Sequence, residues 1–315
     1  LSRVFYSDNG STAAEVALKM AFQYYRHLGA TGTKRSRFVS LKEGYHGDTV
    51  GSVSVGGMEL FHSIFEPLLF HTYLAPSPNC YSCPFGKSHP GCDRECVVAL
   101  EDLLAEKGEE IAAVILEPLV QGAGGMVVYP ADVLRGYFEA AKKHGVLFIV
   151  DEVATGFGRT GTIFACEQAG IEPDMMSVAK ALTGGYLPVA ATLVAEEIYE
   201  TFLGDWAEFK TFFHGHTFTG NPLGCAAALA SLELVKEPEF LPRINRLARH
   251  LAERLERLRG HPNVGDVRQV GMMGGIELVA QRASGQKLDL PERAGHHVCL
   301  AARDAGVLAR PLGDV

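Results

Sequence analysis

Residues 146–151 read V-L-F-I-V-D, an unbroken apolar run that ends on the carboxylate Asp151. Apolar runs of this length without polar alternation are typical of strands that are covered on both faces, as in a parallel sheet. A second run, M-M-S-V-A at 175–179, is followed directly by Lys180. Because the carboxyl ends of parallel strands meet at one edge of a sheet, both charged residues are predicted to face one crevice.

Each of these two charged residues has a plain interpretation and a chemical one. A carboxylate at the edge of a dry core needs a cationic partner to stay ionised, and a pyridinium nitrogen would provide one. Asp151 could equally cap the next loop. Lys180 precedes a glycine-rich turn, where partial desolvation would favour the uncharged amine of Schiff-base chemistry, although a solvated lysine is commoner at a strand end. The spacing, 180 − 151 = 29 residues, equals one strand–helix–strand excursion and favours a shared site.

Outward from these runs, short apolar stretches alternate with amphipathic ones. This pattern favours an α/β fold with a mainly parallel central sheet flanked by helices. The predicted strands are 37–41, 111–116, 146–150, 175–178 and 189–194, and the predicted helices are 11–27, 130–144 and 221–236. Residues 1–6 read like part of a strand, and we interpret the sequence as a fragment that lacks residues at both ends.

The pattern of apolar and charged residues changes near Glu237, where long charged amphipathic segments begin. We therefore predict a large domain over 1–236 and a smaller C-terminal α+β domain over 237–315. The elements predicted for the smaller domain are helices at 239–259 and 291–305 and strands at 264–270, 275–279 and 307–310.

Composition excludes several classes of protein. The chain has 315 residues, is 47% hydrophobic and carries a formal net charge of -8, so it is an ordinary globular chain without a surface for nucleic acid or an anionic membrane. No apolar run is long enough to cross a bilayer, and no signal peptide is visible. Seven cysteines are an odd number without a dense secreted framework, so a reducing cytoplasm is predicted.

Four of the cysteines lie in one loop rich in Pro and Gly, as Cys80-x-x-Cys83 and Cys92-x-x-x-Cys96. This spacing could hold a tetrahedral zinc ion. A compact loop with reduced thiols is the favoured interpretation, because the two cysteine pairs are close together in the sequence. No metal is therefore predicted.

The start of the first helix, D-N-G-S-T at 8–12, has the composition of a phosphate site. Glycine lets backbone amides approach an anion, the hydroxyls are donors, and the helix dipole adds positive potential. Asn and Ser are also routine helix caps, and the segment taken alone favours a cap.

Six stretches together resemble the class III (fold type I) aminotransferases, over nearly the whole chain. They are D-N-G-S-T-A-A-E-V-A-L-K-M-A at 8–21, G-Y-H-G-D-T at 44–49, E-P-L-V-Q-G-A-G-G-M at 117–126, D-E-V-A-T-G-F-G-R-T-G at 151–161, A-K-A-L-T-G-G at 179–185 and H-G-H-T-F-T-G-N-P-L-G-C-A-A-A at 214–228. Within the family the sequence is most similar to the branch of biotin synthesis, in which Ala is usual at position 154.

The resemblance implies that pyridoxal 5'-phosphate (PLP) is the cofactor. The residues implied to bind it are Gly10, Ser11, Tyr45, Asp151, Val153, Lys180, Gly215 and Thr217. Lys180, Asp151 and Tyr45 are the implied catalytic residues. Lys180 would bond to the cofactor and move a proton, Asp151 would pair with the ring nitrogen, and Tyr45 would stack on the ring.

The resemblance also implies partners and substrates. In the family Gly215 and Thr217 reach the phosphate from the neighbouring subunit, so a homodimer with shared active sites is implied. Arg310 would hold the substrate carboxylate, with Arg159 and Gly215 beside the same pocket and Glu117 as a supporting carboxylate.

The implied reaction transfers an amino group to the keto acid 8-amino-7-oxononanoate, giving 7,8-diaminononanoate, with adenosylmethionine or lysine as small-molecule amino donor. An ω-amino-acid or diamine aminotransferase of the same class is the nearest alternative, since it would share Lys180, Asp151 and the phosphate sites. A PLP-dependent aminomutase or decarboxylase is a more distant one.

Overall fold

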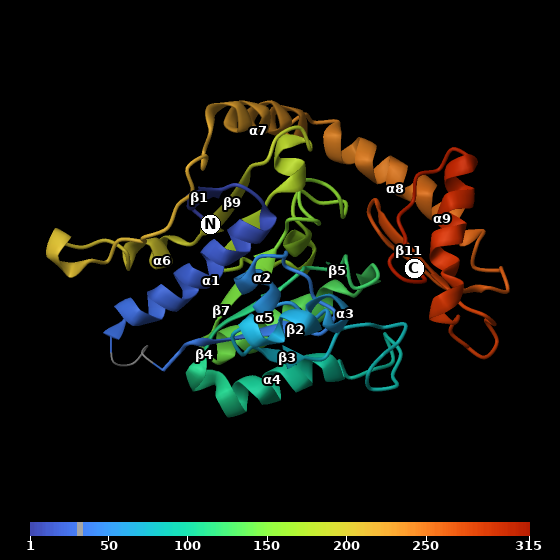
Figure 1. Ribbon diagram of the computed structural model, residues 1–315, viewed down its shortest axis with the longest axis horizontal. Helices are drawn as coiled ribbons and strands as arrows, with labels where there is room; N and C mark the ends of the chain where they lie inside the picture. The colour runs from blue at the N-terminus through green and yellow to red at the C-terminus, as the bar shows by residue number, and fades with distance from the viewer. Residues whose placement is uncertain (30–33) are drawn as a thin grey trace.

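A seven-stranded sheet forms the centre of the molecule in a computed structural model that describes residues 1–29 and 34–315 (Figure 1). Its strand order is β1-β9-β8-β7-β4-β2-β3. The bounds are β1 Arg3–Ser7, β2 Arg37–Leu41, β3 Tyr73–Ala75, β4 Ile111–Leu116, β7 Leu147–Asp151, β8 Met175–Val178 and β9 Ala190–Val194. β8, β7, β4, β2 and β3 pair in parallel, whereas β9 is antiparallel to both β8 and β1. The predicted mainly parallel α/β sheet is confirmed.

The apolar runs form the strands that are covered on both faces. Every residue of β4 and of β7 is buried. Side chains of β7 alternate between two cores: Leu147 and Ile149 pack with α1 (Gly10–His27) on one face, and Phe148 and Val150 pack on the other. Both faces must therefore be apolar, which is why the sequence shows a continuous run and no alternation.

Helices cover the two faces of the sheet. α1 lies against β8 and β9 on one side, while α4 (Glu95–Lys107) and α5 (Ala131–Lys143) pack together on the other (Figure 1). Pro130, predicted inside the first turn of α5, is its N-cap. The remaining elements of the N-terminal part are α2 Val50–Ser54, α3 Glu59–His62, β5 Val120–Gln121, β6 Val127–Val128 and α6 Glu196–Glu200.

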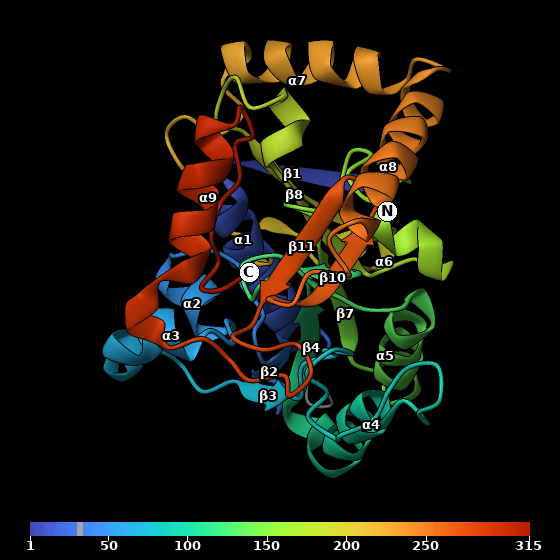
Figure 2. The same cartoon turned by 90° about the vertical axis from the view of Figure 1, so that its right-hand side faces the viewer.

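The C-terminal part extends beyond the sheet. α7 (Pro222–Val235) leads into α8 (Phe240–Glu256), and a hairpin of β10 (Val264–Val270) and β11 (Met273–Leu278) follows. α9 (Ala294–Asp304) lies beside this hairpin (Figure 2). The predicted domain change near Glu237 falls between α7 and α8, and the division into two domains stays a prediction.

One predicted element is wrong. Residues 307–310 form no strand, and Val307 and Leu308 are 58% and 89% exposed. The apolar letters of this segment predicted a strand, but a strand needs a paired neighbour. The backbone amide of Leu278 on β11 donates instead to the carbonyl of Asp314, beyond the predicted strand. Within the described residues, no helix combines the length and apolar character needed to cross a membrane.

Candidate active site

Four parallel strands end at one edge of the sheet, and each is followed by a side chain singled out in the sequence. Tyr45 follows β2, Glu117 follows β4, Asp151 ends β7, and Lys180 comes two residues after β8. Because β2, β4, β7 and β8 are consecutive neighbours in the sheet, these four positions form one row. The crevice predicted from the two apolar runs is thus the carboxyl edge of the sheet, where open α/β sheets bind ligands.

Asp151 is a buried carboxylate with ordered partners. Its side chain is 4% exposed. One oxygen, Oδ1, accepts the backbone amide of Val153 at 3.1 Å, and Oδ2 accepts Nδ1 of His46 at 2.8 Å. Each carboxylate oxygen has two lone pairs, so both can accept one further hydrogen bond. Nε2 of His46 is buried and, in the described part of the chain, lacks a hydrogen-bond partner.

Glu117 connects the strand ends. Oε1 accepts the backbone amide of Tyr45 at 3.0 Å, and Oε2 accepts the amide of Gly122 at 2.9 Å. Burial raises the pKa of Glu117 to about 7, a rise that the Asp151 charge reinforces and that His46 and the two amides oppose. Glu117 therefore holds Tyr45 in place as a structural carboxyl group.

The Tyr45 phenol is half-buried and donates to Oδ2 of Asp48 at 2.8 Å. Burial, together with this hydrogen bond, raises its pKa to about 12. The phenol therefore stays protonated at neutral pH, as expected for a ring that packs and donates a hydrogen bond.

Lys180 begins a 3₁₀ turn, Lys180–Thr183, and its backbone has a φ of +42°. Positive φ is uncommon outside glycine and is concentrated at functional sites. Glu43, Leu119 and Phe157, in the loops beyond β2, β4 and β7, share this property. The expected desolvation of Lys180 is not found, because its side chain is exposed in the single chain.

The first turn of α1 is both a capped helix start and an open amide site. Asn9 is the N-cap, and its Oδ1 accepts the amide of Thr12 at 3.1 Å. The carbonyl of Asn9 accepts the amide of Ala13. Among the described residues, the amides of Gly10 and Ser11 donate no hydrogen bond. The cap thus binds the amides of Thr12 and Ala13 and leaves those of Gly10 and Ser11 available to an anion.

Glycine is required at position 10 by close packing. A Cβ atom there would lie 2.6 Å from Cγ1 of Val153. Gly47 approaches Ser11 in the same way, since a Cβ atom on Gly47 would lie 2.4 Å from that side chain. The Ser11 hydroxyl accepts the amide of Thr49 at 3.0 Å. The phosphate-type segment, Val153 and the loop after β2 therefore form one tightly packed wall.

The segment 214–217 is less closely packed than the wall formed by Gly10, Val153 and the loop after β2. Gly215 has open space around it, and Thr217 is exposed. His216 contacts Asp8 of the same chain, with 2.5 Å between Nδ1 and Oδ2. This contact brings residue 216 near the start of α1 within the same chain. Whether Gly215 and Thr217 serve a neighbouring subunit stays a prediction.

The two arginines assigned to substrate are both exposed. The charge of Arg310 lowers the pKa of the Tyr45 phenol, against the larger effect of burial. The backbone of Arg159 accepts the amide of Met272 in the β10–β11 turn. The structure thus gives Arg159 a backbone contact with the C-terminal hairpin, and the assignment of both arginines to the substrate stays a prediction.

The four loop cysteines lie together, lining one cavity of about 20 Å³. All four are free thiols. Burial, followed by the neighbouring thiols, raises the pKa of Cys80 to about 11, which favours the protonated form. Among the described residues, no group of three His, Cys, Asp or Glu side chains is placed to hold a metal ion.

Sequence reasoning missed His46 as the partner of Asp151. The residue stands next to Tyr45 in a quoted motif, but no spacing links position 46 with position 151. The contact depends on the loop after β2 folding back across β4 toward β7, which only the sheet order reveals.

The sequence profile described as aminotransferase class-III matches residues 1–315. The chain belongs to the class-III aminotransferases. It is 53% identical over 316 residues to the adenosylmethionine-8-amino-7-oxononanoate aminotransferase of Geobacter sulfurreducens, and 54% identical over 319 residues to that of Nitratidesulfovibrio vulgaris. Both alignments cover the whole chain, which spans 69% and 58% of these relatives' lengths.

Solved structures give the same result. The crystal structure of the adenosylmethionine-8-amino-7-oxononanoate aminotransferase of Methanocaldococcus jannaschii superposes with a TM-score of 0.92 at 43% identity, covering 100% of this chain and 69% of that one. An amine transaminase of an uncultivated Pseudomonas species, in the PLP-bound form, matches with a TM-score of 0.94 at 39% identity, covering 99% of this chain and 70% of that one. These matches confirm the fold type I architecture and the aminotransferase family.

Proposed function

We propose that the chain transfers an amino group to 8-amino-7-oxononanoate, giving 7,8-diaminononanoate, with PLP as cofactor. The observation that carries the proposal is the row of Tyr45, Glu117, Asp151 and Lys180 along the carboxyl edge, with Asp151 buried and held by His46. The substrate follows from relatives of this name that are 53–54% identical along the whole chain.

The residues at the sheet edge fit PLP. Buried Asp151 has lone pairs free for a protonated ring nitrogen, and Lys180 offers a primary amine. The amides of Gly10 and Ser11, at a helix N-terminus, suit a phosphate. Val153 packs on Gly10, so its methyl groups lie between the phosphate-type segment and Asp151. When bound, PLP supplies an electron sink for the carbon that loses a proton.

The chain's own residues then have separate tasks. Asp151 holds a proton on the ring nitrogen, because a buried carboxylate stabilises a cation beside it. Lys180 moves a proton at its Nζ, from an exposed position two residues after β8, the neighbour of the strand that ends on Asp151. Glu117 fixes the backbone of Tyr45, whose neutral phenol packs on the bound cofactor and excludes water.

A second copy of the chain is part of this proposal. α7 is apolar at most of its positions, yet only Gly224 and Ala228 are buried among its described residues. Large apolar side chains of α7 and of segments that precede it in the sequence are 63–87% exposed: Leu223, Leu229, Tyr186, Phe213 and Phe218. A surface of this kind marks an interface, and a homodimer would bring Gly215 and Thr217 to the partner's site.

The proposal is tested through Arg310. The keto acid carries its carboxylate far from the reacting carbonyl, and a planar guanidinium binds a carboxylate with two parallel hydrogen bonds. Arg310→Ala should raise KM for 8-amino-7-oxononanoate, with a loss of about 2–5 kcal/mol, while PLP absorbance stays unchanged. Arg303→Ala, in the last turn of α9, is the control. Unchanged KM in Arg310→Ala would place the carboxylate elsewhere.

An amine or ω-amino-acid aminotransferase is the second candidate function. The amine transaminase cited above matches the fold as closely as the M. jannaschii enzyme does, with TM-scores of 0.94 and 0.92. Competing 8-amino-7-oxononanoate against simple keto acids separates the two, and carbon dioxide or an isomer as product would indicate a decarboxylase or an aminomutase. We propose a cytoplasmic location, for which the free thiols are the support.

A further inference from the structure

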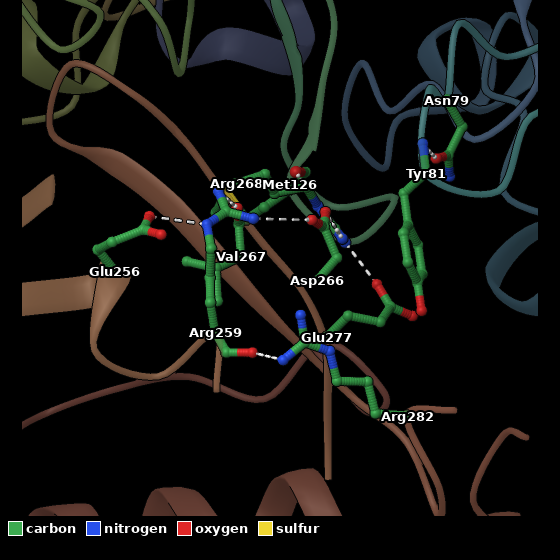
Figure 3. A network of polar contacts seen from close by, with 10 residues as sticks. All are labelled: Asn79, Tyr81, Met126, Glu256, Arg259, Asp266, Val267, Arg268, Glu277 and Arg282. Atoms are coloured by element: carbon green, nitrogen blue, oxygen red, sulfur yellow. Dashed lines mark hydrogen bonds and ion pairs between the residues drawn. The ribbon is translucent and has the colours of Figure 1, made fainter. Parts of the chain in front are cut away.

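Arg268, on β10, is a buried cation that joins the C-terminal hairpin to the loop near the active site (Figure 3). Its side chain is only 11% exposed. Nε donates to the carbonyl of Met126 at 2.7 Å, and Nη2 donates to the carbonyl of Gly125 at 2.5 Å. The same guanidinium pairs with Glu277 at 2.7 Å and with Asp266 at 3.2 Å. The planar guanidinium of Arg268 thus bonds to the carbonyls of the loop on one side and to the carboxylates of the hairpin on the other.

The loop that Arg268 holds begins at the candidate site. Gly125 and Met126 both donate their amides to the carbonyl of Gly122, so they belong to one turn. The amide of Gly122 in turn donates to Glu117, which accepts the amide of Tyr45. A continuous set of hydrogen bonds therefore runs from the Tyr45 backbone to the 122–126 turn, whose carbonyls at Gly125 and Met126 accept from Arg268.

The chain segment that bears Arg310 passes over the same junction. Beyond Arg310, the carbonyl of Asp314 accepts the amide of Leu278 on β11 at 2.8 Å. Val315 lies against the turn, since a Cβ atom on Gly125 would be 3.5 Å from its Cγ2 atom. Arg268 is thus at the point where the turn from Glu117 and the tail from Arg310 meet.

We propose that Arg268 is a positioning residue that sets the distance between Arg310 and the Tyr45 edge, and through it the affinity for the substrate carboxylate. The inference rests on the proposed function, in which Arg310 binds that carboxylate. Lysine cannot replace this arginine, because one ammonium group cannot reach two carbonyls and two carboxylates in a single plane. Without the fork, the hairpin and the tail lose their fixed place on the 122–126 turn.

Arg259 provides a matched control. It belongs to the same polar network, pairs with Glu256 at 2.8 Å and lies 3.7 Å from Asp266 (Figure 3). Its hydrogen bonds stay within the C-terminal part, including one to the carbonyl of Val267. Arg259→Lys therefore weakens the network without touching the turn at Gly125 and Met126.

The experiment measures KM and kcat for the keto acid in holoenzyme carrying Arg268→Lys, Arg259→Lys, Arg310→Ala, or Arg268→Lys with Arg310→Ala. We expect Arg268→Lys to raise KM about tenfold with kcat within about threefold of the parent, and Arg259→Lys to leave KM within about twofold. In the double variant KM should not rise beyond that of Arg310→Ala, because Arg268 acts through Arg310.

Unchanged KM in Arg268→Lys, or multiplication of the two effects in the double variant, would overturn the proposal. A loss of kcat and PLP absorbance without a KM change would indicate a structural role only and would also overturn it. The proposed function is judged separately, by the parent enzyme's own turnover of 8-amino-7-oxononanoate. If the parent prefers another keto acid, the same four variants are compared on that acid.

Discussion

The carboxyl edge of the sheet and the segment 204–235 are held in opposite ways. At the edge, Asp151 and Glu117 are 4% and 5% exposed, and each has two hydrogen-bond partners. Both partners of Glu117 are backbone amides, and those of Asp151 are one backbone amide and the His46 side chain. In the segment, Phe218 and Leu223 are 75% and 74% exposed, although both are large apolar residues. One region is complete within a single chain, whereas the other presents surface that a second protein surface would cover.

This difference teaches where the site's parts come from. Strand ends supply the groups that must be fixed within tenths of an ångström, because a buried parallel sheet allows them little freedom. The exposed segment carries Gly215 and Thr217, whose proposed roles involve a neighbouring subunit. Substitutions at the edge should therefore act within one chain, and substitutions in the segment should act across the proposed dimer.

The largest effect is expected at the edge itself, for Lys180→Ala. Only a primary amine at this position can bond to the cofactor and return a proton, so kcat should fall on the order of 10⁴-fold or more. Turnover assays and borohydride reduction followed by peptide mapping measure it, with exposed Lys236→Ala as control. Cofactor fixed to a different lysine would remove Lys180 from the site.

A smaller loss is expected for Asp151→Asn. The amide keeps the size of the side chain but removes the charge that holds a proton on the ring nitrogen, so kcat should fall about 10²- to 10³-fold with PLP still bound. His46→Asn, which removes only the partner of Oδ2, should cost about tenfold. Rates near those of the parent in Asp151→Asn would show that this charge is not needed.

Mixed dimers test whether the exposed segment acts across the interface. Lys180→Ala and Thr217→Glu subunits should each be inactive, the second because a carboxylate repels the phosphate. After equal mixing and re-equilibration, about a quarter of the parental activity should return, since half of the dimers hold one intact site. Absence of any recovery, with mixed dimers verified by mass, would place Thr217 in the site of its own chain.

The smallest effect concerns Glu117 and pH. Because folding raises its pKa from 4.5 to about 7, the folded protein binds more protons between these pH values than the unfolded chain. Its stabilising contribution is therefore complete below pH 4.5 and is lost as pH rises through 7. In the cofactor-free protein, the unfolding free energy of the parent should fall relative to Glu117→Gln by roughly 2–3 kcal/mol between pH 5 and 8.

Denaturant unfolding at several pH values measures this difference. If the difference in unfolding free energy between the parent and Glu117→Gln stays constant from pH 5 to 8, Glu117 is ionised throughout that range. That result would change the description of the carboxyl edge in the comparison with the segment 204–235, because the edge would then tolerate two buried negative charges, Glu117 and Asp151, side by side.

The sequence by itself determined the strands that carry the site and the residues at their ends. β2, β4, β8 and β10 have the predicted bounds, and β7 is displaced by one residue. This worked because a strand covered on both faces must be apolar at every position, so the pattern is local. The family followed from six motifs taken together. The spacing of Asp151 and Lys180 was attributed to one strand–helix–strand unit, but the segment between β7 and β8 holds only the 3₁₀ turn Ala165–Ala169.

Only the tertiary structure decided the contacts between distant loops. Nothing in the sequence pairs His46 with Asp151, or Arg268 with the carbonyls of Gly125 and Met126, because these contacts depend on sheet order and on hairpin placement. The same limit explains the wrong strand at 307–310 and the unexpected exposure of Lys180. A local apolar pattern does not reveal whether a neighbouring strand is available for pairing. It also does not reveal whether a side chain in a turn is buried. Both depend on chain segments that are far away in the sequence.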